Sequence, residues 1–161
     1  MSTDTMRHKH GDAVPIVAAV DSGTVISIGD LLYLETDDVR PASSQAAGSA
    51  LANTQESFHD KFLGVAAQRS RAGDVDDIRV DTAGVHEFPC DSTNWEIGDL
   101  VGVAESSAFA LNPQKVIRLG VFSAALNNRA IGKCAERGTA LTKVKIRIES
   151  TVTTGGPKAA A

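Results

Sequence analysis

An internal repeat constrains the fold of this chain more than any other feature of its sequence. The segment Ile28-Gly29-Asp30-Leu31 recurs as Ile97-Gly98-Asp99-Leu100, at an offset of 69 residues. Two later segments recur in the same order at an offset of 68 residues: 62–69 resembles 130–137, and 78–82 resembles 146–150. The last pair alternates apolar and polar residues, as a strand with one buried face does. The sequence therefore predicts two copies of one β-rich unit, over residues 24–90 and 93–152.

The predicted fold is all-β, a barrel or a sandwich built from the two pseudo-repeated units. Gly-Asp turns between short apolar runs favour antiparallel strands. The alternating stretch 85–88 is expected to be such a strand, with His86 on its outer face. We expect the two units to form a single β domain over residues 14–152, which is long enough to bury a core. Residues 1–13 are expected to be a flexible arm and residues 153–161 a loose tail, because neither contains core-forming residues.

One short helix is expected, over residues 54–61. Asn53 and Glu56 have the spacing of a helix-capping residue and the acid that accompanies it. Leu51, Phe58 and Phe62 are spaced so that they share one helix face, which would pack on the sheet.

The overall charge and hydropathy narrow the classes of partner. The net charge of −4 and the pI near 5.5 argue against nucleic acid, whose phosphates attract basic surfaces. No apolar run approaches the roughly 18–20 residues of a membrane span, and residues 1–12 lack the apolar core of a signal peptide. We therefore expect synthesis in the cytoplasm and no membrane partner.

In that compartment Cys90 and Cys134 are expected to be reduced thiols, although the spacing leaves a disulfide open.

Motifs of catalysis and cofactor binding are missing from the sequence. It contains no G-x-S-x-G, no H-E-x-x-H, no G-x-G-x-x-G and no paired-cysteine zinc spacing. His8 and His10 lack the cysteine or carboxylate partners of a typical metal site. We expect no enzymatic activity, no cofactor and no metal, although a triad assembled in space stays open.

Two groups of basic residues are candidates for partner binding. Arg7, His8 and Lys9 lie in the arm. Lys143, Lys145 and Arg147 alternate with apolar residues, so they stand on one face of a strand. On an acidic protein such a stripe predicts a docking surface for an acidic partner. The alternative is a solubilising outer face that protects an edge strand.

Several short segments carry a resemblance to a known family: Ile28-Gly29-Asp30-Leu31, Phe62-Leu63-Gly64-Val65-Ala66 followed by Ile78-Arg79-Val80, Thr82-Ala83-Gly84-Val85-His86-Glu87-Phe88, Ile97-Gly98-Asp99-Leu100-Val101-Gly102-Val103, and Ala130-Ile131-Gly132. Over residues 14–152 the chain resembles the capsid decoration, or cement, proteins of tailed-phage heads.

The resemblance implies a structural virion protein without catalytic residues. Such a protein binds the outside of a phage head and stabilises the capsid by bridging neighbouring major capsid proteins, with arms that order on binding. Symmetric sites on a shell favour a homo-oligomer, and a trimer in particular. The alternative function is a β-rich head fibre or adhesin module that binds carbohydrate or a host surface. An enzyme of unfamiliar type is a third possibility, for which no constellation speaks.

Overall fold

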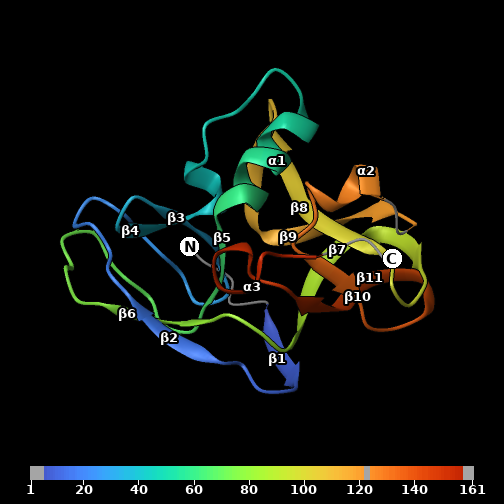
Figure 1. Ribbon diagram of the computed structural model, residues 1–161, viewed down its shortest axis with the longest axis horizontal. Coiled ribbons are helices and arrows are strands. Elements are labelled where there is room, and N and C mark those ends of the chain that lie inside the picture. Colours follow the sequence, from blue (N-terminus) through green and yellow to red (C-terminus); the bar gives the residue numbers. More distant parts are fainter. Residues whose placement is uncertain (1–5, 122–123, 158–161) are drawn as a thin grey trace.

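The computed structural model describes residues 6–121 and 124–157, and its strands form two antiparallel sheets (Figure 1). The six-stranded sheet has the order β1-β7-β11-β10-β8-β9, and the five-stranded sheet the order β2-β6-β5-β3-β4. The predicted all-β fold is confirmed. In the described part of the chain, no helix has the length and apolar character needed to span a bilayer.

The strands are β1 Arg7–His10, β2 Pro15–Ala18, β3 Leu31–Glu35, β4 Asp38–Pro41, β5 Phe62–Ala66, β6 Ile78–Asp81, β7 Val85–Trp95, β8 Leu100–Ser107, β9 Ala110–Gly120, β10 Gly132–Cys134 and β11 Gly138–Ile148. The helices are the 3-10 turn η1 Ala42–Ser44 and the α-helices α1 Leu51–Lys61, α2 Ala124–Asn127 and α3 Thr151–Thr154.

The five-stranded sheet closes on itself. Ala19, just after β2, forms a parallel bridge with Asp38 of β4, and Val39 N donates to Ala19 O at 2.9 Å. The first and last strands of the sheet are therefore joined. The closed sheet encloses a small core of eight buried residues: Val20, Ile26, Leu32, Val39, Leu63, Ala66, Ile78 and Val80.

A larger core joins the two sheets and α1. Leu31 and Val65 of the smaller sheet belong to the same buried cluster as Val101 and Ile146 of the larger one. Figure 1 shows α1 above the junction, with the smaller sheet to its left. The α1 residue Phe58 lies in this cluster, and its ring centroid is 5.6 Å from that of Phe62.

The predicted helix is confirmed, but its predicted start is wrong. The capping position is Ala50, which makes no side-chain cap hydrogen bond, and Asn53 lies inside the helix. Asn53 Nδ2 instead donates to Ser49 Oγ at 2.8 Å. Packing of the apolar face on the core therefore decides where this helix begins, since no capping side chain does.

The two Ile-Gly-Asp-Leu segments form the same turn. In the first, Asp30 Oδ2 accepts from Ser27 N at 2.9 Å, and in the second Asp99 Oδ2 accepts from Glu96 N at 2.9 Å. The glycine of each turn has positive φ, 94° at Gly29 and 90° at Gly98, a conformation that glycine adopts without strain. The carboxylate and the glycine explain why this sequence occurs twice.

Strand pairing repeats in the same way. Leu32 of β3 lies opposite Gly64 of β5, and Val101 of β8 lies opposite Gly132 of β10. The run β3-β5-β6 in one sheet therefore corresponds to β8-β10-β11 in the other.

The last strand of each unit, however, is shifted relative to the sequence alignment. Val80 lies opposite Ala66, whereas Ile146 lies opposite Cys134, so Val80 corresponds to Ile146 and the offset is 66 residues. A shift of two residues leaves the same side chains on the buried face, so alternation alone could not detect it.

The limits of the two units also differ from those predicted. Ile16 of β2 lies opposite Val80, and His86 of β7 lies opposite Ile146, which makes β2 and β7 equivalent. Strand β7, which the sequence assigned to the end of the first copy, opens the second unit. The units thus run from β2 to β6 and from β7 to β11.

Two terminal segments are more ordered than predicted. Residues 7–10, expected in a flexible arm, form β1 at the edge of the six-stranded sheet, because Met6 is buried and Arg7 pairs with Glu87. Residues 151–154, partly in the expected tail, form α3, whose first turn is capped by Ser150 Oγ. Residues 1–5 and 158–161, also assigned to the arm and tail, lie outside the described residues.

Candidate functional site: a basic sheet face

The register of the six-stranded sheet brings the two predicted groups of basic residues together. Arg7 of β1 lies opposite Glu87 of β7, and Glu87 lies opposite Lys145 of β11. Residues directly opposite in neighbouring antiparallel strands stand on the same face of the sheet. Arg147 and Lys143, two positions either side of Lys145, share this face because side chains alternate along a strand.

Further basic residues enlarge this surface. Lys133 of β10 lies directly opposite Arg147. Lys9 lies at an irregular point of β1, and its Nζ is 3.7 Å from Glu87 Oε1, which places it beside the same row. We call this surface the basic face. It consists of Arg7, Lys9, Lys133, Lys143, Lys145 and Arg147, with Glu87 among them.

The acidic groups at this surface leave it predominantly positive. Glu87 Oε1 lies 3.7 Å from Lys9 Nζ, and Glu136 Oε1 accepts from the backbone N of Lys145 at 2.8 Å. Glu149 follows Arg147 on the same side of the chain, so three carboxylates stand against six cations. The opposite side of β11 is apolar and buried, with Val144 and Ile146 fully enclosed. The basic side chains therefore stand on a rigid support, and their outward direction is fixed by the packing beneath them.

The structure separates His8 from the other predicted site residues. His8 lies opposite His86, and the ring centroids are 5.0 Å apart. His86, predicted on the outer face, is fully buried, because the alternation of β7 places Phe88 and His86 on the core side and Glu87 outside. Lys133 is absent from the predicted site residues. It lies between Gly132 and Cys134 in a predicted strand, and the alternation of that strand is enough to place its side chain on the outer face.

The alternative explanation of the basic stripe, protection of an edge strand, does not apply to its Arg147 end. Strand β11 lies between β7 and β10, and Arg147 lies opposite Lys133 of β10. Strand β10 pairs only with residues 146–148, so Lys143 lies beyond its end and can still protect a free stretch of β11.

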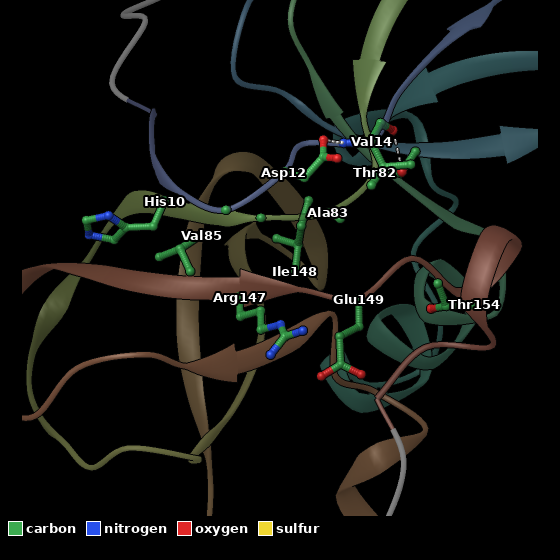
Figure 2. Close-up of a pocket in the computed structure, with 12 residues that line it drawn as sticks. His10, Asp12, Val14, Thr82, Ala83, Val85, Arg147, Ile148, Glu149 and Thr154 are labelled. Carbon is green, nitrogen blue, oxygen red and sulfur yellow. Dashed lines mark hydrogen bonds between the residues drawn. The ribbon is translucent and has the colours of Figure 1, made fainter.

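A groove of about 730 Å³ borders the basic face (Figure 2). It lies between the segment that connects β1 to β2 and the end of β11, and its lining includes His10, Asp12, Arg147 and Glu149. Figure 2 shows His10 pointing away from the other labelled side chains, and Arg147 and Glu149 on the same side of β11. Because cations and carboxylates both line the groove, it has no strong preference for either charge.

The connecting segment is fixed by hydrogen bonds. Val14 is a β-branched residue with φ of 41°, an unfavourable conformation. Asp12 Oδ1 accepts from Val14 N at 2.9 Å, and Thr82 Oγ1 donates to Val14 O at 2.7 Å. These bonds stabilise the conformation and position β1 on β7.

The cysteines are not poised for nucleophilic chemistry. Both are free and buried in the shared core. Burial raises the pKa of Cys90, and it raises the pKa of Cys134 to about 11. Among the described residues there is also no group of three or more His, Cys, Asp or Glu side chains that could bind a metal ion.

No protein-family model matches the chain, and a search of curated proteins gives no match either. Function must therefore be inferred from the geometry of the basic face and from the sequence.

Proposed function

We propose that this chain is a structural virion protein that binds the outside of a phage head and stabilises the capsid by bridging neighbouring major capsid proteins. The basic face is the observation that carries this proposal. It is a broad, predominantly positive surface on a protein whose net charge is −4. Such a surface suits recognition of an acidic patch on a large partner, because complementary charge steers association and fixes orientation.

The architecture supports a bridging role. Two β units that share one core form a rigid body, so a load applied at one end is transmitted to the other. Symmetric positions on a shell favour a symmetric oligomer of the bridging protein, and we expect a trimer in which each copy presents its own basic face.

The alternative function, a head fibre or adhesin module, lacks a specific observation in its favour. Recognition of carbohydrate relies on exposed aromatic rings. Within residues 6–121 and 124–157, Trp95, Tyr33 and three phenylalanines are buried in the shared core, and Phe109 is the aromatic residue with substantial exposure.

Binding to purified shells tests the proposal. We would measure sedimentation of the protein with heads that lack it, for the native sequence and for a variant in which Lys143, Lys145 and Arg147 are replaced by Ser. The matched control replaces Arg69, Arg71 and Arg79, three exposed arginines on or near β6, and changes the net charge by the same amount.

The expected result is weaker binding and a weaker salt dependence for the β11 variant, because exposed charges interact over a distance that salt shortens. The control variant should bind as the native protein does. Equal binding by all three proteins would show that the basic face is only a solvated surface.

A further inference from the structure

A buried pair of side chains anchors β1 to β7, and its chemistry is unusual. His86 Nδ1 lies 3.4 Å from Met6 Sδ, and His86 Nε2 lies 3.0 Å from Ala83 O. His86 is fully buried and Met6 is 7% exposed. The proposed function uses neither residue.

The two contacts of His86 decide which of its nitrogens bears the proton. Ala83 O can only accept, so His86 Nε2 must donate and the neutral ring has its lone pair on Nδ1. That lone pair faces a thioether sulfur, which is itself an acceptor. In that neutral ring no second proton lies between the two atoms.

Two lone pairs that face each other in a buried place are the donor arrangement of a metal site. With metal–nitrogen and metal–sulfur bonds of about 2.0 and 2.3 Å, atoms 3.4 Å apart subtend an angle of about 105° at the metal, near the tetrahedral value. A thioether with an imidazole selects a soft cation such as Cu(I) over hard cations, which prefer oxygen ligands.

A third donor lies nearby. His8 Nε2 lies 2.9 Å from Gly11 O, so in a neutral ring it donates there and leaves the lone pair on Nδ1. The His8 and His86 rings are 5.0 Å apart. The carboxylate of Asp81, whose charge acts on His86, already pairs with Arg79, whose Nε lies 3.5 Å from Asp81 Oδ1.

We propose that Met6, His86 and His8 form a binding site for a soft monovalent cation, Cu(I) in chemical class. The ion would join two residues of the amino-terminal segment to β7 of the sheet. Gly29 permits this arrangement, because a Cβ at that position would lie 2.8 Å from Met6 Cβ. The site stands apart from the basic face, on the opposite side of β7.

Titration with Ag(I), a redox-stable probe of the same class, tests the proposal. The ε-methyl resonance of Met6 reports directly on its sulfur, and the sequence contains only one other methionine, Met1. Because thiols also bind Ag(I), the titration is repeated with Cys90 and Cys134 replaced by Ala. The variants are Met6→Leu and His86→Phe, and His10→Asn is the control, since His10 is exposed in the same strand.

We expect the Met6 resonance to shift and saturate near about one equivalent of Ag(I). Affinity should fall by about tenfold or more in Met6→Leu and His86→Phe and stay unchanged in His10→Asn. Amide exchange across residues 7–10 should slow when Ag(I) is added. An unshifted Met6 resonance, or unchanged affinity in Met6→Leu, would overturn the site.

If His86→Phe does not fold, the proposal can still be tested in the native protein, because nitrogen NMR shows which ring nitrogen of His86 carries the hydrogen. The proposal requires the tautomer with hydrogen on Nε2 of His86. Hydrogen on Nδ1 would mean an ordinary weak hydrogen bond to sulfur, and no metal site.

Discussion

Replacing Gly64 by alanine should destabilise the protein strongly, and replacing Gly132 should do so by a similar amount. A Cβ at Gly64 would lie 2.2 Å from Asp81 O, and a Cβ at Gly132 would lie 2.2 Å from Arg147 O. Each glycine lies in the central strand of its unit, where an added Cβ would meet the backbone of the neighbouring strand. The identical distance at equivalent positions makes the pair a test of the structural repeat.

The magnitude follows from the obstructing atom. A carbonyl oxygen in a sheet cannot rotate away as the end of a side chain can, so the strands must separate by more than about 1 Å to restore ordinary contact. Overpacking of a core costs about 1–3 kcal/mol, and loss of a hydrogen bond beside it costs about 1 kcal/mol more. We therefore expect each substitution to lower the free energy of unfolding by about 2–4 kcal/mol.

The assay is urea unfolding followed by the fluorescence of the buried Trp95, the single tryptophan of the chain. The matched control is Gly23→Ala, because a Cβ there would have no neighbour within 4 Å. That control should be neutral or stabilising by up to about 1 kcal/mol. A change of less than about 0.5 kcal/mol for Gly64→Ala would refute the close approach of β5 and β6.

Three further predictions concern buried polar groups and thiols. Asp30→Ala and Asp99→Ala should each cost about 1–3 kcal/mol in thermal or urea unfolding, because each leaves a turn amide and other donors without an acceptor; neutrality of either would contradict the shared turn. Burial raises the pKa of Cys134 from 9.0 to about 11, so the unfolded chain loses that proton first and stability should fall as the pH rises from about 9 to about 11. At pH 8 the native Cys134 thiol should resist alkylation in a mass-spectrometric time course, and alkylation at the rate of the unfolded chain would contradict its burial.

The sequence was sufficient to predict the fold class and the repeat. Short-range signals caused this success: the Asp30 and Asp99 turns need a carboxylate and a glycine at fixed positions, and alternation marked the strands. The same signals are local, so they could not reveal strand order. For that reason β7 was assigned to the wrong unit, and the two-residue shift between Val80 and Ile146 was invisible.

The sequence predicts the two groups of basic residues separately, but it does not predict that they lie side by side on one sheet face. Alternation along β11 was enough to identify Lys143, Lys145 and Arg147. Their proximity to Arg7 depends on β1 pairing with β7, which is a contact between segments about 80 residues apart that no local pattern encodes. The prediction of His86 on the outer face is wrong because its neighbours do not decide the face. Between the apolar Val85 and the charged Glu87, a histidine can point either to the core or to solvent.

The central claim is that this chain is a component of a phage shell, and quantitative mass spectrometry of purified particles tests it most directly. The measurement compares the amount of this chain with that of the major capsid protein. We predict a fixed ratio of this chain to the major capsid protein, either equal amounts or a simple constant fraction. Absence of the chain from purified particles would contradict the claim.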